Sequence, residues 1–166
     1  MNDITILLSA SGSPSMPGMI KCFKNNGERN IRIVGVDMDD EPSIKFLVDA
    51  FYKVPAASDP SYCDVILEIC RKESVTIYFP NISAEVSAVS NRLFDFKKIG
   101  VIVSISNIKS VEIANNKLLT YDILSAEDIP TPKYYPVHSV TDFKEGCNAM
   151  GYPEKAVCLK IVNGSG

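Results

Sequence analysis

Apolar residues gather in short runs that recur along the first two-thirds of the chain. A run that is apolar on both faces and rich in β-branched residues is typical of a strand buried inside a parallel sheet. Four such strands are predicted at Ile4–Leu8, Ile31–Val36, Val75–Phe79 and Val101–Ile105. A fifth, shorter strand is predicted at Tyr52–Val54.

Helical patterns fill the intervals between these strands. Pro17 suits the first turn of a helix that ends at Asn25-Asn26-Gly27. Further helices are predicted within Pro42–Phe51, from Asp59-Pro60 to Lys72 and over Ser83–Lys98. Strands that alternate with helices predict an open, mostly parallel sheet with helices on both faces. The expected fold class is therefore α/β, with three layers and strands ordered as in a doubly wound, Rossmann-like sheet.

The pattern changes after Ser106. Helices are predicted over Ile108–Ala114 and Lys117–Ala126 with no strand between them, and Pro130 and Pro132 then force an extended linker. Shorter elements follow: a strand at Tyr134-Tyr135, a helix from Ser139 to Met150 and a strand over Ala156–Val162. A strand that runs into Gly164-Ser165-Gly166 normally returns to a partner, so we expect the chain to be cut within a second domain.

Composition and charge narrow the range of functions. The chain has 166 residues, 46% apolar and 22% charged, which excludes a disordered tail, collagen and a coiled coil. A net charge of −3 provides no basic field for nucleic acid. The start Met1-Asn2-Asp3 lacks a basic leader region, and no apolar run approaches the ~18 residues of a membrane helix. We expect no nucleic-acid or membrane partner and a cytoplasmic location.

Cysteine and histidine are too few and too scattered for a metal centre. The five cysteines form no CxxC pair, and His138 is the single histidine. We therefore expect no metal site and no disulfide in this chain, with five free thiols and no catalytic triad.

A glycine- and proline-rich segment, Gly12-Ser13-Pro14-Ser15-Met16-Pro17-Gly18, follows the first strand. It could bind an anion through backbone N–H groups at a helix start, or it could simply be a tight connection. Asp37 at the end of the second strand could hold ribose hydroxyls, as in a dinucleotide-binding fold. The segment is not GxGxxG, because two prolines interrupt it and one glycine is missing.

Two isolated charged residues, Glu85 and Lys160, also have two interpretations each. Glu85 follows the strand that ends at Pro80, where open α/β sheets bind ligands, but it could equally stabilise a helix start. Lys160 lies on the opposite face of its strand from Val157, Leu159 and Ile161, so it either faces an anion or reaches solvent at an edge. Lys117, taken alone, is an ordinary solvated lysine of a helix.

Taken together, these segments resemble a known arrangement. The order is Gly-Ser-Pro-x-x-Pro-Gly, Ile-Val-Gly-Val-Asp-Met-Asp, then Phe-Tyr-Lys-Val-Pro. Later come Asn115-Asn116-Lys117-Leu118-Leu119-Thr120-Tyr121, Ile129-Pro130-Thr131-Pro132-Lys133 and Lys160-Ile161-Val162-Asn163-Gly164-Ser165-Gly166. The chain resembles the N-terminal part of an ATP-grasp protein, similar to the carbamoyl phosphate synthase large subunit and related carboxylate–amine ligases.

The resemblance implies a pre-ATP-grasp α/β domain over residues 1–110 and the truncated beginning of an α+β ATP-grasp domain over 111–166. Lys117 and Lys160 match two lysines that contact ATP phosphates, and Gly164, Ser165 and Gly166 match the start of the loop that closes over them. Glu85, with Gly12 and Ser13, matches the substrate side of the first domain. No catalytic residue and no metal ligand is expected among the 166 residues.

The implied activity of a complete protein is ATP-dependent activation of a carboxylate as an acyl phosphate, which an amine or ammonia then attacks. ATP and Mg²⁺ serve the complete protein, neither is expected to bind this chain tightly, and the chain alone is expected to be inactive. A homodimer is compatible with the resemblance.

The sequence departs from the family at two places. Ser9-Ala10 stands where the family often has Thr-Gly, and Ser83 stands where a carboxylate is expected. Two other functions stay open from the residues alone. One is a free-standing dinucleotide-binding module that uses Gly12, Gly18 and Asp37. The other is a non-catalytic interaction domain.

Overall fold

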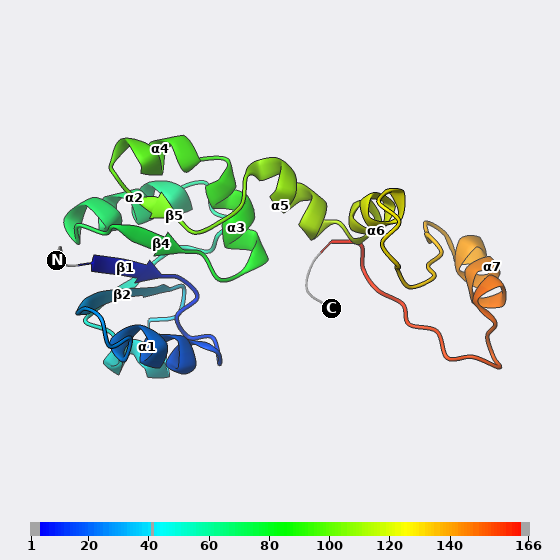
Figure 1. Cartoon of the computed structure of the whole chain (residues 1–166), viewed down its shortest axis with the longest axis horizontal. Coiled ribbons are helices and arrows are strands. Elements are labelled where there is room, and N and C mark those ends of the chain that lie inside the picture. The colour runs from blue at the N-terminus through cyan, green and yellow to red at the C-terminus, as the bar shows by residue number, and fades with distance from the viewer. Residues whose placement is uncertain (1–3, 41, 164–166) are drawn as a thin grey trace. The chain divides into compact units, whose positions relative to one another are not determined.

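The structure, a computed structural model, describes residues 4–40 and 42–163. The chain divides into two compact units, unit 1 (Met1–Val111) and unit 2 (Glu112–Gly166), and the boundary falls within a helix. Figure 1 shows the elements of both units along the chain.

Unit 1 is built on a five-stranded parallel sheet in the order β3-β2-β1-β4-β5. The strands are β1 (Ile4–Leu8), β2 (Ile31–Asp37), β3 (Ala50–Lys53), β4 (Ile77–Phe79) and β5 (Ile102–Val103). The predicted α/β fold class with a doubly wound, three-layer arrangement is confirmed. β5 is much shorter than the predicted Val101–Ile105, because the Ile105 N–H turns back to bond the Val103 carbonyl and ends the extended segment.

Alternate residues of β1 supply the cores on the two faces of the sheet. Ile6 and Leu8 pack on one side with residues of α1 (Met16–Lys24) and of the 3₁₀ helix η1 (Ser43–Phe46). Leu7 packs on the other side with residues of α2 (Tyr62–Lys72), α3 (Ser83–Ser90) and α4 (Leu93–Lys98). Figure 1 shows the same division, with α1 on one face of the sheet and α2 and α4 on the other. The last three residues of β1, Ile6, Leu7 and Leu8, are therefore buried.

Helix predictions in unit 1 needed two corrections. The single helix predicted over Ser83–Lys98 is two helices, since α3 ends at Ser90 and α4 begins at Leu93. Ser90 Oγ and Asn91 Nδ2 both donate to the Ser87 carbonyl, and such side-chain bonds compete with continued helix. The helix predicted within Pro42–Phe51 is only one short 3₁₀ turn, because β3 begins at Ala50.

Helices account for most of the regular structure in unit 2. α5 (Ile108–Asn115) crosses the unit boundary, and α6 (Lys117–Ala126) and α7 (Val140–Met150) follow. α7 starts as predicted at Ser139, whose Oγ accepts from the Asp142 N–H at 3.1 Å, and it ends at Gly151 with φ +88°. The strands predicted at Tyr134-Tyr135 and over Ala156–Val162 do not form.

Those two segments failed as strands for the same physical reason. A strand needs a neighbour that accepts its backbone hydrogen bonds. In the described part of unit 2, the only β-type pairing is a single antiparallel bridge between Asn116 and Asn163. The segment 156–162, in which apolar residues alternate, is therefore extended chain that belongs to no sheet.

Candidate functional site

The strand order produces a topological switch point at the carboxyl ends of β1 and β4 in unit 1, and this region is called the crevice below. β1 pairs with β2 on one side and with β4 on the other. The chain leaves β1 toward α1 on one face, and it leaves β4 toward α3 on the opposite face. Loops that diverge in this way leave a gap at the carboxyl ends of the strands, where open α/β sheets bind ligands. The predicted substrate-side residues Gly12 and Ser13 lie in the loop after β1, and Glu85 lies in the first turn of α3, just after the loop that follows β4.

Glu85 is buried at this crevice, with 5% of its surface exposed. Its Oε2 accepts from Ser9 Oγ at 2.6 Å, from the Asn81 N–H at 3.1 Å and from the Ile82 N–H at 3.3 Å. The last two bonds cap the start of α3 with the carboxylate of its first turn. The first bond reaches the loop after β1. Glu85 thus ties together the two loops that border the crevice.

A chain of hydroxyl groups continues from Glu85 into the core. Ser9 Oγ lies 3.4 Å from the Tyr78 hydroxyl, which lies 3.0 Å from the Tyr62 hydroxyl. Burial raises the pKa of both tyrosines well above the ordinary value, and the charge of Glu85 adds to this effect. Both phenols therefore stay protonated and serve as neutral hydrogen-bonding groups.

The loop after β1 is held by Asp37 at the end of β2. The Gly12 N–H donates to Asp37 Oδ2 at 2.7 Å, and the Asp39 N–H donates to Oδ1 at 3.0 Å. A Cβ at Gly12 would lie 3.1 Å from Oδ2, so the close approach favours glycine there. Both carboxylate oxygens of Asp37 thus already accept backbone hydrogen bonds. In a dinucleotide-binding fold this carboxylate would hold the ribose. Gly18 lies inside α1, away from the loop to which the sequence assigned it.

The serines of this loop have different surroundings. Ser13 Oγ lies 3.0 Å from Ser15 Oγ at an exposed position. Ser11 is fully buried, and its Oγ has no hydrogen-bond partner among the described residues. Sequence reasoning overlooked Ser9 and Ser11, because serines after a strand read only as loop residues. Their burial depends on β2 and β4 approaching from both sides.

The predicted phosphate-binding residues lie in unit 2, at the start of α6 and in the extended segment 156–163. The Lys117 N–H donates to the Val162 carbonyl at 3.1 Å, next to the Asn116–Asn163 bridge. The structure therefore brings the segment that carries Lys160 against the helix start that carries Lys117. Lys160 is exposed and Lys117 is half-buried. Gly164, Ser165 and Gly166 lie outside the described residues.

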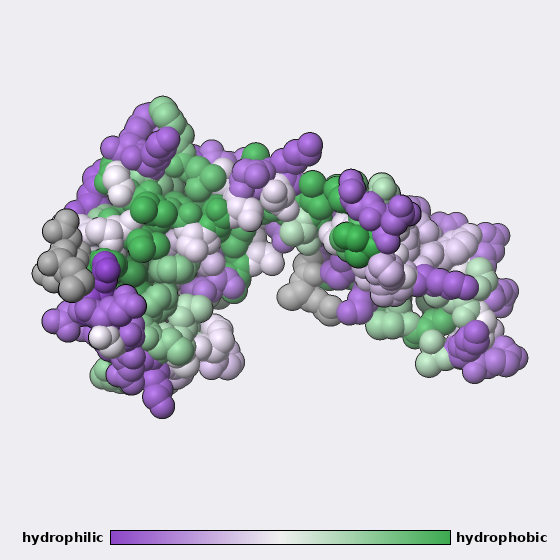
Figure 2. All heavy atoms as spheres, in the orientation of Figure 1, coloured by the Kyte–Doolittle hydropathy of each residue, from purple (hydrophilic) through white to green (hydrophobic). Residues whose placement is uncertain are grey.

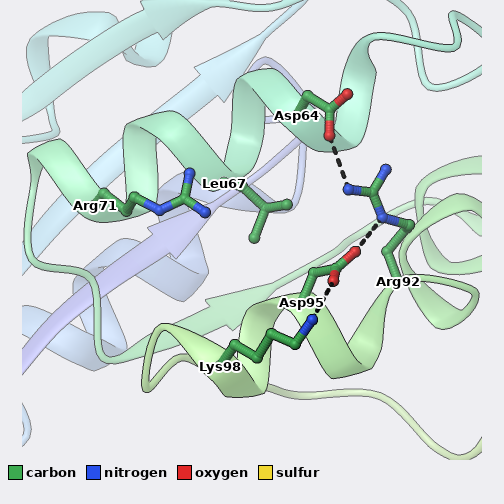
Figure 3. Close-up of a pocket in the computed structure, with 6 residues that line it drawn as sticks. All are labelled: Asp64, Leu67, Arg71, Arg92, Asp95 and Lys98. Carbon is green, nitrogen blue, oxygen red and sulfur yellow. Dashed lines mark hydrogen bonds and ion pairs between the residues drawn. The ribbon is translucent and has the colours of Figure 1, made fainter.

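A surface cleft between α2 and α4 has a volume of about 280 Å³ (Figure 3). Its lining residues are mainly charged: Asp64, Leu67, Arg71, Arg92, Asp95 and Lys98. Arg92 bridges Asp64 at 2.8 Å and Asp95 at 2.5 Å, while Lys98 lies 3.7 Å from Asp95. The hydrogen bond from Arg92 holds the pKa of Asp95 below its ordinary value.

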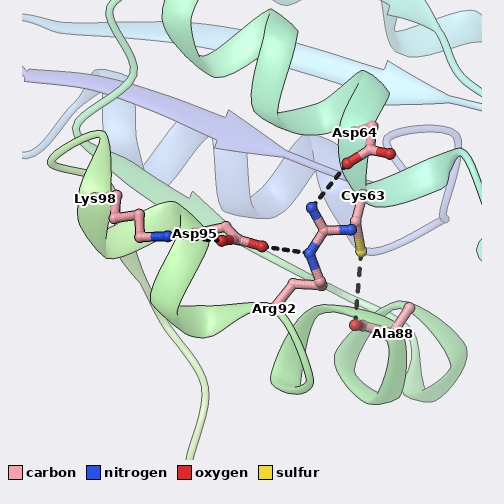
Figure 4. A network of polar contacts seen from close by, with 6 residues as sticks. All are labelled: Cys63, Asp64, Ala88, Arg92, Asp95 and Lys98. Carbon is pink, nitrogen blue, oxygen red and sulfur yellow. Dashed lines mark hydrogen bonds and ion pairs between the residues drawn. The ribbon is translucent and has the colours of Figure 1, made fainter.

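The same network fastens three helices together (Figure 4). Arg92 follows α3 and reaches Asp64 on α2, while Asp95 and Lys98 belong to α4. Beside them, Cys63 Sγ donates to the Ala88 carbonyl of α3 at 3.6 Å. Burial raises the pKa of Cys63 and of Cys70, which marks both thiols as packing groups. The acidic and basic side chains of these ion pairs neutralise one another and are partly exposed. The cleft is therefore best explained as a contact between helices.

Two features that the described residues lack bear on function. No group of three or more His, Cys, Asp and Glu side chains in 4–40 and 42–163 could hold a metal ion. In those same ranges, no helix has the length and apolar character to cross a bilayer. All five cysteines are free thiols in the structure.

Comparisons with known proteins give one family model and several similar solved structures. The family model of the PylC-like N-terminal domain matches residues 6–104. Curated protein sequences give no match. Two similar solved structures each align with 90% of this chain. One is N5-carboxyaminoimidazole ribonucleotide synthetase of Thermus thermophilus, with 17% identity and a TM-score of 0.61. The other is the biotin carboxylase domain of Hydrogenobacter thermophilus 2-oxoglutarate carboxylase, with 15% identity and a TM-score of 0.61. The chain spans 37% and 33% of these two chains, about a third of their length.

Proposed function

Because this chain belongs to the family of the PylC-like N-terminal domain, we propose that it forms the N-terminal part of an ATP-dependent carboxylate–amine ligase. It also has the fold of the N-terminal part of ATP-grasp ligases. In the proposed reaction, ATP activates a small carboxylate as an acyl phosphate, which an amine or ammonia attacks. The finer part of the proposal is a substrate chemistry like that of carbamoyl phosphate synthase.

The observation that carries the ATP role is the bond from the Lys117 N–H to the Val162 carbonyl. This bond joins the backbone of Lys117 to the segment that carries Lys160, although the two lysines are 43 positions apart in the sequence (160 − 117). The place where the two segments meet is called the lysine junction below. Lysine ammonium groups suit a triphosphate, because charge-assisted hydrogen bonds to phosphate are stronger than neutral ones. We assign Lys117 and Lys160 to the phosphates of ATP, with Gly164, Ser165 and Gly166 as the following loop.

Mg²⁺ would bridge the phosphates and offset their charge in such an enzyme. The described residues do not fit a Mg²⁺ site by themselves, since they contain no cluster of acidic side chains that could hold a metal. The proposed contact with the ATP phosphates therefore depends on Lys117 and Lys160 alone and requires no metal ligand from these residues.

The crevice of unit 1 is the proposed substrate side. Gly12 and Ser13 border it on the β1 side, and Glu85 borders it on the β4 side. Glu85 is buried and already accepts three hydrogen bonds, so its role here is to fix the two loops at a set separation. The dinucleotide alternative lacks support, because Asp37 is bonded to Gly12 and Gly18 is helical.

Unit 2 has too little buried surface to be a complete domain. Among its described residues only Gly146 is buried, and Figure 2 shows apolar residues on the visible surface over α6. Exposed apolar side chains of this kind favour packing against further protein. We propose that residues 111–166 are the first stretch of an ATP-grasp domain that is completed by more chain. The exposed apolar side chains include Leu119, Ile123, Ile129, Val140, Phe143, Leu159 and Ile161.

The remaining parts of the proposal concern setting and assembly. Free thiols and the use of ATP favour the cytoplasm. The proposed partners are the small carboxylate and the amine or ammonia, and the chain could act as a homodimer. The mild net charge of −3 gives no reason to expect nucleic acid as a partner.

A titration that varies only the phosphates tests the ATP role. We expect weak binding in this chain, so NMR shift changes would be followed with ATP and with adenosine. Lys117→Ala and Lys160→Ala should each weaken ATP binding roughly tenfold, because a charge-assisted contact is worth about 1.5–3 kcal/mol, and should leave adenosine unchanged. Lys144→Ala, at an exposed position of α7, is the matched control.

The outcomes separate cleanly. If each lysine variant binds ATP within about twofold of the parent, the two lysines are ordinary solvated residues. If ATP binds the parent no better than adenosine, the phosphate site itself is wrong.

A further inference from the structure

Asn116 is a polar residue to which the ATP role assigns nothing, yet both its side chain and its backbone make contacts at the lysine junction. It precedes α6 in an extended conformation with φ −116° and ψ 107°. Its Oδ1 accepts from the Leu118 N–H at 3.0 Å and from the Leu119 N–H at 3.1 Å. It therefore caps the first turn of the helix that begins with Lys117.

The backbone of the same residue holds the distant segment. Asn116 pairs with Asn163 in an antiparallel bridge, and the next residue, Lys117, donates its N–H to Val162 at 3.1 Å. In the sequence, Asn163 directly precedes Gly164-Ser165-Gly166. One residue thus sets where α6 begins and where the segment that carries Lys160 meets it.

The turn before Asn116 is also secured. Thr120 Oγ1 donates to the Ile113 carbonyl at 2.8 Å and to the Asn116 carbonyl at 3.0 Å. The end of α5 and the start of α6 are thereby tied across Asn116. A single β-bridge is weak by itself, so its persistence depends on a rigid neighbour. The capped helix start provides that rigidity.

From this geometry we propose that Asn116 is a positioning residue that couples Lys117 to the segment Lys160–Asn163 and so presents both lysines to one triphosphate. This inference rests on the proposed ATP role of the two lysines. Asn116 touches no phosphate in this account. It acts because the loss of its cap frays the first turn of α6, which moves Lys117 and releases Val162 together.

The experiment compares two helix caps of unit 2 in the full chain. Asn116→Ala removes the cap at the lysine junction, Asn116→Ser keeps a capping oxygen, and Ser139→Ala removes the matched cap of α7. The first readout is hydrogen exchange of the Lys117 amide. Asn116→Ala should accelerate it at least about fivefold, Asn116→Ser should restore most of the protection, and Ser139→Ala should leave it unchanged.

The second readout is nucleotide affinity by NMR titration. Asn116→Ala should raise the Kd for ATP about fivefold or more and change the Kd for adenosine less than twofold. Asn116→Ser should return ATP binding to within about twofold of the parent. If the cap had only a structural role, its removal would weaken the binding of ATP and of adenosine equally, or would change neither.

Each contrary result has its own meaning. Unchanged exchange of the Lys117 amide in Asn116→Ala overturns the coupling and leaves the ATP role standing. Equal losses for ATP and adenosine overturn the positioning role as well. A parent chain that does not distinguish ATP from adenosine overturns the proposed function, and the inference with it.

Discussion

Unit 1 and unit 2 bury their apolar side chains in different ways. In unit 1 the sheet has a core on each face, and every buried apolar side chain of the described residues belongs to this unit. In unit 2 the helices and extended segments leave large apolar side chains exposed, such as Leu159 at 71% and Ile161 at 63%. Burial of apolar surface is the main favourable term in folding, so the two units must differ in their own stability.

The comparison also shows what holds each unit. In unit 1, hydrogen bonds join residues far apart in the sequence, such as Glu85 and Ser9, which are 76 positions apart. In unit 2 the bonds are mainly local, as in the caps at Asn116 and Ser139. Local bonds specify helices without fixing them to a core.

The largest expected effect comes from a matched pair of phenylalanines. Phe96 in unit 1 is fully buried, and Phe143 in unit 2 is 41% exposed. Phe96→Ala should lower the free energy of unfolding by about 3–5 kcal/mol, because it leaves a cavity in a packed core. Phe143→Ala should cost less than about 1 kcal/mol. Urea unfolding followed by circular dichroism measures both, and equal losses would remove the distinction between the units.

Removal of the Glu85 carboxylate should have the next largest effect. Glu85→Ala leaves Ser9 Oγ and the Asn81 and Ile82 N–H groups without their buried acceptor, and we expect a loss of about 2–3 kcal/mol. Glu85→Gln keeps one acceptor oxygen and should lose less than half of that. If both variants unfold at the parent's urea concentration, Glu85 does not join the two loops.

A glycine pair tests packing at smaller scale. A Cβ at Gly146 of α7 would lie 2.9 Å from the Tyr135 ring, whereas a Cβ at Gly18 of α1 meets nothing within 4 Å. Gly146→Ala should destabilise α7 by about 1 kcal/mol, because overpacking outweighs the better helix propensity of alanine. Gly18→Ala should stabilise unit 1 by about 0.5–1 kcal/mol. Hydrogen exchange of α7 and urea unfolding check the two signs, and destabilisation by both would contradict the packing argument.

The smallest expected effect is a pH response at the start of α7. The His138 N–H donates to the Asp142 carboxylate at 2.9 Å, and this bond, with that of Ser139, lowers the pKa of Asp142 below 3.8. Because folding lowers this pKa, the carboxylate stabilises the fold above about pH 4, and the contribution disappears as pH falls through the folded-state pKa. NMR titration of the His138 amide follows the loss.

Asp142→Asn is the control for this titration, since it keeps an acceptor oxygen that does not ionise. It should abolish the pH response of the His138 amide below about pH 4. A response that persists in Asp142→Asn would mean that another group titrates at this helix start.

Most of unit 1 could be predicted from local pattern. The strand at Ile4–Leu8 lies where the sequence placed it, and in unit 2 so does the helix over Lys117–Ala126. The resemblance to the N-terminal part of an ATP-grasp protein is confirmed by the family model and by the fold. Residue pattern sufficed because apolar runs, proline positions and capping residues act within a few positions of the chain. The roles of Lys117 and Lys160 in ATP binding stay predictions.

Tertiary structure alone decided the rest, because it depends on which distant segments meet. The alternation in 156–162 predicts a strand, but only Asn116 approaches Asn163, so a single bridge forms in the described residues. Asp37 has the position of a ribose-binding acid, and the Gly12 N–H occupies it. Glu85 became a buried link because β1 and β4 are neighbours in the sheet. The sequence determined which segments could form elements, whereas burial and hydrogen-bond partners depended on contacts that no local pattern contains.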